Sequence, residues 1–357
     1  MNEQGGSSRG LISDAEFIRK CLIVLGIVLL TLVLWSLSSV LLLGFGAILV
    51  AIIFHSAAEG LVRYLRVPER WSLALASLLI LGLFVGLAIL FGTQLRSQLT
   101  NVIEQLPRAL DNFGRAIGVG AVSDDLSNII DSQSAGRLAS RLAGIGGTIL
   151  GGLADFLLVI VAGLYIAASP KTYVDGLVKL FPVKHHERVR GSLHASGEAL
   201  KLWLLSQLIA MVCVGVLSTL AYWMIGLPYF YALGLIAGLV DFIPFLGPIL
   251  GALPAVMIAF TLEGNAALWT IVAVLAIQQI EGNIIFPLVA RKVVTIPAAL
   301  ALFAIVAGGI LFGSFGLIFG FPLAVVTYVL VKKLYVRETL GEDTPIPGED
   351  ETADKPS

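Results

Sequence analysis

Several apolar runs in this sequence exceed the roughly 18 residues that a helix needs to cross the hydrocarbon core of a bilayer. Hydrophobic residues make up 57% of the chain and charged residues 13%, whereas a soluble domain carries about 25% charged residues. The first run follows a polar N-terminal tail and is too long for a signal peptide, so we expect a retained helix. We predict an all-α polytopic membrane protein with about eight hydrophobic helical segments and additional amphipathic extramembrane helices.

The composition also argues against other classes of protein. A net charge of −1 gives no reason to expect a nucleic-acid partner. Cys21 and Cys213 lie in separate apolar segments and suggest no disulfide framework. No cluster of His, Cys, Asp or Glu has metal-ligand spacing. A phosphate-binding G-x4-G-K-[ST] loop is missing from the sequence, so ATP is not expected to drive the protein directly. We expect no cofactor and no enzymatic activity, but a possible coupling ion, H⁺ or Na⁺.

The chain divides into alternating apolar and polar parts. In chain order we expect a polar tail (1–17), three transmembrane helices (18–92), an extracytoplasmic helical segment (93–147), a transmembrane helix (148–168), cytoplasmic amphipathic helices (169–202), a C-terminal transport region (203–335) with broken helices at 231–262 and 298–331, and a disordered acidic tail (336–357). Residues 18–35 and 38–55 are expected to form a tight hairpin. Val189, Leu193 and Leu200 have the spacing of an amphipathic helix lying on the membrane.

The distribution of Lys and Arg predicts the orientation, because these residues concentrate on the cytoplasmic side. The rule places both termini in the cytoplasm. If 231–262 and 298–331 each crossed the membrane once, Arg291 and Lys292 would lie outside, against the rule. If both regions are re-entrant hairpins, with 266–290 as the crossing segment, these two residues and the tail all lie inside. We favour the re-entrant scheme.

Both broken regions carry a similar motif, Gly247-x3-Gly251-x2-Pro254 in the first and Gly316-x3-Gly320-x-Pro322 in the second. Broken helices in corresponding positions are a pointer to a transporter's binding site, because irregular backbone persists in a membrane only where protein or water covers it. The alternative is close packing, since Gly-x3-Gly is common wherever membrane helices meet. We predict a binding site between the two regions. The proposed breaks and hinges are Pro244, Gly247, Pro248, Gly251, Pro254, Pro287, Gly309, Gly313, Gly316, Gly320 and Pro322.

Polar residues accompany these breaks, and they are the predicted substrate-binding residues. On a helix, Gln278 and Glu281 share one face, while Gln279 and Asn283 share another. Because an acid is costly in the bilayer interior, Glu281 and Asp241 are functional candidates. The alternative for Asp241 is a helix cap at the membrane interface.

Three blocks in the C-terminal third, "DFIPFLGPILGALPA", "QQIEGNIIFPLVARKV" and "IPAALALFAIVAGGILFGSFGLIFGFPLAVV", resemble the signature blocks of the AI-2E (autoinducer-2 exporter) family. The resemblance extends over about residues 15–335. It implies a multi-spanning transporter of the bacterial inner membrane, usually with eight helices. It also implies that the protein forms homo-oligomers, of which pentamers are one kind. Some members are assigned to export of a quorum-sensing furanosyl diol and others to sodium–proton antiport. The positions that match are Pro244, Gly247, Pro254, Glu281, Asn283, Pro287, Gly309, Gly313, Gly316 and Pro322.

Three functions compete. The leading hypothesis is a secondary transporter that exports a small polar solute such as autoinducer-2, with Glu281 as the candidate proton carrier. The alternative is a Na⁺(Li⁺)/H⁺ antiporter in which Asp241 and Glu281 bind cation and proton in turn. An intramembrane hydrolase is disfavoured, because no membrane-embedded histidine accompanies Ser314 and no nucleophile–base pair can be assembled.

Overall fold

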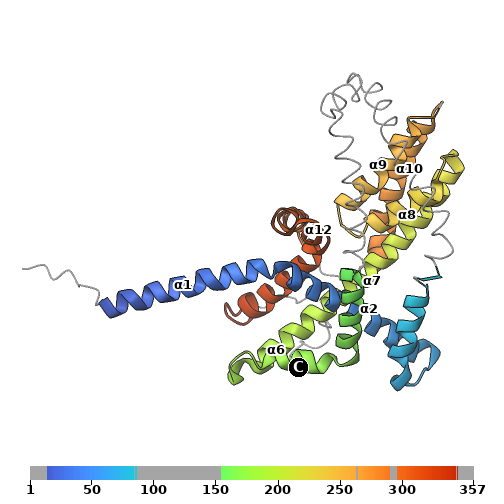
Figure 1. The fold of residues 1–357 in the computed structure, drawn as a ribbon. Coiled ribbons are helices and arrows are strands. Elements are labelled where there is room, and N and C mark those ends of the chain that lie inside the picture. Colours follow the sequence, from blue (N-terminus) through green and yellow to red (C-terminus); the bar gives the residue numbers. More distant parts are fainter. Residues whose placement is uncertain are drawn as a thin grey trace, which may run out of the picture.

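A computed structural model describes residues 14–83, 85–86, 154–262, 264–289, 296–342 and 344 (Figure 1). Regular structure in these ranges is helical throughout. Five helices are long and apolar enough to cross a membrane, or six if one sharply bent pair counts as a span. The expected all-α membrane class is confirmed. The predicted segment 93–147 lies outside the described ranges.

The N-terminal helices do not form the expected hairpin. Helix α1 (Asp14–Ser36) is separated from α2 (Ser38–Leu65) by Leu37 alone. The Leu37 amide donates to the Val33 carbonyl and the Leu41 amide to the Leu37 carbonyl, both at 2.9 Å. This is the i→i−4 pattern of a helix, so the chain carries on with no reversing turn. In Figure 1, α1 projects away from the rest of the protein and α2 continues inward from its end.

The helix Ala154–Ala168 ends in an 86° bend before α6 (Pro170–Val178). Pro170 explains the break, because proline lacks the amide that would continue the helix and is favoured at the first position of a new one. A short 3₁₀ turn (Val183–His185) then leads into α7 (His186–Ile225).

Helix α7 is a single helix of 40 residues, about 60 Å long. The sequence led us to expect an amphipathic helix on the membrane and a separate span starting at residue 203, whereas the structure joins the two in one helix; the point at which this helix enters the membrane stays a prediction. No proline interrupts the helix, and it ends where Gly226 adopts a left-handed conformation (φ 85°) and caps the last turn. Leu200 in the predicted membrane-facing stripe is buried against protein.

The region 231–262 folds back on itself as a first hairpin, made of α8 (Phe230–Val240) and α9 (Leu246–Ala259). These arms of 11 and 14 residues measure about 16 and 21 Å, short of the roughly 30 Å hydrocarbon core. Gly247 approaches the backbone of Val240, and Gly251 approaches that of Ala237, so the arms run antiparallel.

The region 298–331 forms a second hairpin within α12 (Ala298–Leu330). Gly313, with φ 65° and ψ −143°, divides it into arms of residues 298–312 and 314–330. Gly316 then packs against Gly308, and Gly320 against Ile305, so these arms are also antiparallel. Both broken regions therefore fold back on themselves, and whether they re-enter or cross the membrane stays a prediction. Arg291 and Lys292, on which the predicted orientation depends, lie outside the described residues.

Between the two hairpins, α10 (Ala266–Ile280) continues through a π-helical turn (Glu281–Ile285) into α11 (Phe286–Val289). Together they form an apolar helix, Ala266–Leu288, that is long enough to span a membrane.

Helix α7 is the central element, since it packs against α2, α8, α10 and α12. Its Trp203 is only 2% exposed and lies in the main core cluster. The ring lies 5.7 Å from that of Phe242, in the turn of the first hairpin, and 5.2 Å from that of Phe321, in the second arm of the second hairpin. Trp203 therefore connects the two hairpins.

The tail is ordered beyond the point where disorder was expected. A π-helical turn runs from Val331 to Arg337, and Glu338 forms an ion pair with Arg188 of α7. The prediction of a disordered tail is therefore wrong for its first residues, and the remainder lies mostly outside the described ranges.

Candidate functional site

The turn of the first hairpin, residues 241–245, is the main irregularity of the backbone near the predicted site. Phe245 has φ 66°, a left-handed conformation that is unusual for a bulky residue. The Leu246 amide donates to the Pro244 carbonyl at 2.8 Å, and the Gly247 amide donates to Ile243 at 2.7 Å. A side chain at Gly247 would collide with the carbonyl of Val240, so only glycine allows the chain to reverse this tightly.

Asp241 lies at the start of this turn and is only 1% exposed. Its backbone carbonyl accepts a 2.7 Å hydrogen bond from the Gln207 side chain on α7. Neither carboxyl oxygen has a hydrogen-bond partner among the described residues. The side chain does not cap α9, which begins after Phe245 without a side-chain cap, so the structure does not bear out the capping alternative.

Gln207 was not predicted as part of this site. It is 3% exposed and anchors the broken turn to the central helix. The sequence carries a signal for it, a lone glutamine within the apolar stretch "LLSQLIAM". A polar side chain in such a run is expected to turn toward other protein groups, not toward lipid.

Glu281 lies on the inner side of the α10 span. It interacts electrostatically with Asp241, and its Oε2 is buried without a hydrogen-bond partner among the described residues. The π-helical turn begins at Glu281, and such turns in helices frequently accompany functional sites. The structure therefore places the two acids that the sequence singled out within range of electrostatic interaction, although they are 40 positions apart.

Gln278 lies one helical turn before Glu281 and lines a narrow crevice between α7, α8, α9 and α10. The crevice has a volume of about 10 Å³, close to that of one water molecule. Its polar lining also includes Ser218 and Tyr222 of α7. The expected shared face of Gln278 and Glu281 thus points into the helix bundle.

Gln279 and Asn283 lie elsewhere. The Asn283 amide donates to the Gln279 side-chain oxygen at 2.7 Å, and both side chains are exposed. The predicted polar cluster is therefore divided between two faces of one helix, with only Gln278 and Glu281 on the side that faces Asp241.

The paired glycine motifs are explained by packing. A Cβ on Gly251 would lie 2.9 Å from Cα of Ala237, and one on Gly320 would lie 2.9 Å from Cα of Ile305. Gly247 and Gly316 make equivalent contacts nearer the turns. Each Gly-x3-Gly motif lies on the second arm of its hairpin and faces the first arm, so the packing alternative is correct for these four residues.

The other predicted hinges lie in the two turns, inside helices or next to the π-helical turn. Pro244 lies in the first turn and Gly313 is itself the second turn. Pro254 and Pro322 lie inside helices, and Pro248 lines the narrow crevice. Pro287 follows the π-helical turn, and Gly309 precedes the second turn on its first arm.

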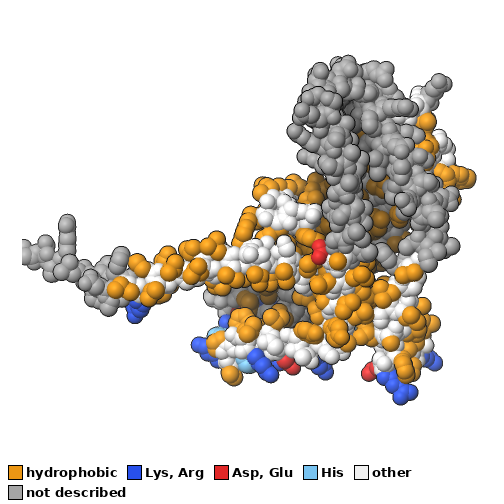
Figure 2. Space-filling view, in the orientation of Figure 1, with side chains coloured by type: hydrophobic (Ala, Val, Ile, Leu, Met, Phe, Trp, Pro, Cys, Tyr) orange, Lys and Arg blue, Asp and Glu red, His pale blue; other side chains and the backbone are white. Residues whose placement is uncertain are grey.

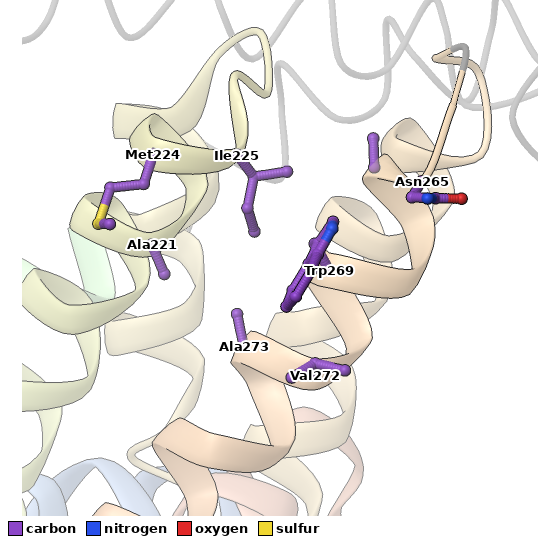
Figure 3. Close-up of a pocket in the computed structure, with 8 residues that line it drawn as sticks. Ala221, Met224, Ile225, Asn265, Trp269, Val272 and Ala273 are labelled. Carbon is purple, nitrogen blue, oxygen red and sulfur yellow. The ribbon is translucent and has the colours of Figure 1, made fainter.

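The two turns do not lie together. The ring of Phe312, beside the second turn, lies 6.0 Å from that of Trp35 in α1, whereas the first turn contacts Trp203. A larger groove of about 630 Å³ lies between the end of α7 and the start of α10, lined by residues such as Met224 and Trp269 (Figure 3). Helix α12 lines neither this groove nor the narrow crevice.

Among the described residues, no three His, Cys, Asp or Glu side chains come together in a way that could hold a metal ion. The site offers two carboxyl groups that interact electrostatically, and the adjacent crevice adds amide and hydroxyl side chains. Such groups can exchange a proton or hydrogen-bond a polar solute.

Apolar helices long enough to span a membrane, two helical hairpins, and a buried acid at the turn of one of them are typical of polytopic membrane proteins of the transporter class. Comparison with known sequences narrows the class, because residues 23–335 match the family described as AI-2E family transporter. The chain belongs to this family.

Its relatives include two proteins of Bacillus subtilis (strain 168) that are named as transport proteins. YrrI is 29% identical over 66% of this chain and 69% of its own length. YueF is 25% identical over 82% of this chain and 83% of its own length. The AI-2 transport protein TqsA of Escherichia coli (strain K12) is 20% identical over 80% of this chain and 84% of its own length.

Proposed function

We propose that this transporter exports a small polar solute, of the size and hydroxyl-rich character of autoinducer-2, across the bacterial inner membrane. One observation supports the proposal: Asp241 is buried at the broken turn and interacts electrostatically with Glu281, and each acid has a buried carboxyl oxygen without a hydrogen-bond partner among the described residues. A buried carboxyl group is costly unless it is neutral or paired, so a proton, a cation or a solute hydroxyl is needed there.

The resemblance to TqsA, an AI-2 transport protein, supports the solute class, although at 20% identity. In the proposed mechanism Glu281 carries the coupling proton, Asp241 interacts with it electrostatically, and Gln278 contributes an amide for a solute hydroxyl.

We also propose that the protein is a homo-oligomer. Gln279 and Asn283 are exposed on an apolar spanning helix, where polar side chains normally face protein or water and not lipid. A neighbouring copy would cover this pair.

The function can be tested in proteoliposomes loaded with the autoinducer-2 furanosyl diol, by measuring its release with and without a pH gradient. We expect Glu281→Gln to lose the dependence on the gradient and Asp241→Asn to reduce release by about tenfold or more. Asp155→Asn, which alters a partly exposed acid in another apolar helix, serves as the control and should leave release unchanged. Unaltered, gradient-dependent release by both variants would refute the role of these acids.

The same pair of acids would suit exchange of Na⁺ for H⁺, so the assay needs a second arm. Proton movement driven by Na⁺ alone, followed by dye quenching in the absence of the diol, would support antiport instead. Release of the diol without any effect of Na⁺ would support export.

A further inference from the structure

Helix α6 and the turn that follows it, residues 170–184, carry an exposed apolar surface. Tyr173 and Leu177 lie one turn apart on α6, and Leu180 and Phe181 follow in the turn after its end. All four are exposed, with Leu180 at 78%, and Val183 beyond them is 82% exposed. No described element of the protein covers this surface.

The position of α6 is held by contacts on its other side. Val178 is 1% exposed and faces the protein. The Arg190 guanidinium of α7 binds the Asp175 carboxylate at 2.6 Å. The ring of His186 lies 2.9 Å from the Phe181 carbonyl and closes the turn. These contacts hold α6 in place, so the position of the apolar surface is fixed relative to α7.

The orientation of α6 suits the surface of a membrane. The preceding apolar helix, Ala154–Ala168, is bent by 86° from α6. If that helix crosses the bilayer, α6 runs nearly parallel to the bilayer plane. Charged residues within α6, such as Lys171 and Asp175, keep it out of the hydrocarbon and at the interface.

Three lysines, Lys171, Lys179 and Lys184, accompany the apolar surface. All are exposed, and none forms an ion pair with a described residue. Basic and apolar side chains gather along the lower edge of the protein in the space-filling view (Figure 2). Apolar residues that enter a membrane interface next to basic residues that remain in the headgroup layer are typical of helices that bind anionic membranes.

We propose that residues 170–184 form a binding surface for anionic phospholipid headgroups. The apolar side chains enter the interface, and the three lysines bind phosphate or glycerol-phosphate groups. Because the helix that carries them continues directly from Ala154–Ala168, lipid bound there is in a position to influence that helix. Each lysine near an anionic surface should favour anionic over zwitterionic lipid by roughly fivefold at most.

The test uses the full chain in a thiol-free background, Cys21→Ser with Cys213→Ala, with Leu180→Cys labelled by a fluorophore. The protein is placed in bilayers of equal parts phosphatidylglycerol and phosphatidylcholine, in which either one lipid or the other is brominated. Bromine quenches only over short distances, so the ratio of the two quenching efficiencies reports which lipid lies beside α6. We expect brominated phosphatidylglycerol to quench several times more strongly, and this ratio to fall at high salt.

A matched pair of variants separates the lysines from general surface charge. Lys179→Gln with Lys184→Gln should bring the ratio close to one. Arg63→Gln with Arg70→Gln, which removes the same charge elsewhere, should leave it unchanged. Circular dichroism and gel filtration check that both variants fold.

Equal quenching by the two brominated lipids in the unsubstituted background would overturn the proposal, as would an equal loss in both double variants. Weak quenching by both lipids would also overturn it, because a protein partner or a second copy would then cover the surface.

Discussion

Replacing Trp203 by alanine tests whether this residue connects the two hairpins. The indole is 2% exposed and contacts the rings of Phe242 and Phe321 at centroid distances of 5.7 and 5.2 Å. Each such aromatic pair contributes about 0.5–1.5 kcal/mol, so the two contacts account for about 1–3 kcal/mol. The cavity that remains adds about 24 cal/mol per Å³ of unfilled volume. We expect the free energy of unfolding to fall by about 3–5 kcal/mol, the usual range for buried tryptophan.

The same helix offers a matched control. Trp223 is 60% exposed, so Trp223→Ala removes an identical side chain from α7 without opening a cavity. Its expected cost is below about 0.5 kcal/mol. The loss of unfolding free energy for Trp203→Phe should lie between the losses for the two alanine variants. It keeps one aromatic ring and breaks no hydrogen bond, because the indole N–H has no acceptor among the described residues.

Stability can be measured by titrating SDS into protein in mild-detergent micelles and following helix content by circular dichroism, which does not depend on tryptophan emission. Release of the diol from proteoliposomes should also fall for Trp203→Ala, because the turn that carries Asp241 loses its support. Equal costs for Trp203→Ala and Trp223→Ala would refute the packing that joins the hairpins.

Two further predictions concern glycines and use the same SDS titration. Gly238→Ala should destabilise the protein by about 1–3 kcal/mol, because its new Cβ would lie 2.7 Å from the Met211 carbonyl oxygen. Gly215 lies on the facing helix, where a new Cβ would make only ordinary contacts, so Gly215→Ala should be neutral or slightly stabilising. A larger loss of stability for Gly215→Ala than for Gly238→Ala would contradict the described packing of α7 on α8. Gly313→Ala should cost about 1–3 kcal/mol, because φ 65° with ψ −143° is accessible almost only to glycine. Gly309→Ala meets only a flexible side chain and should cost less; if both alanines were tolerated equally, the turn would not lie at Gly313.

Interruption of an apolar run by Gly and Pro indicated both regions that fold back, but it did not distinguish the turn residues Pro244 and Gly313 from the glycines that pack against the opposite arm. Lipid cannot satisfy freed backbone groups, so these interruptions had to be features of the fold. The motif Gly-x3-Gly is the same whether a helix breaks or packs closely. Only the contacts of Gly251 and Gly320 with the opposite arm decide for packing.

The sequence also did not predict that one helix runs through residue 202. Polarity changes along α7 from an amphipathic to an apolar pattern, but a helix can continue through such a change when no residue breaks its backbone hydrogen bonds. The short junction at Leu37 similarly lacks Gly and Pro, so its helical hydrogen bonds persist where a hairpin was expected.

The sequence alone determined the membrane environment, the helical class and the identity of the two acids, because hydrophobic length and the cost of charge in lipid act on each segment separately. Only the tertiary structure decided which polar residues meet. Helix spacing places Gln278 and Glu281 on one face of their helix, but it does not specify which face turns inward. That choice, and the recruitment of Gln207 from 34 residues away, depends on how α7, α8 and α10 pack, and therefore on contacts that no single segment contains.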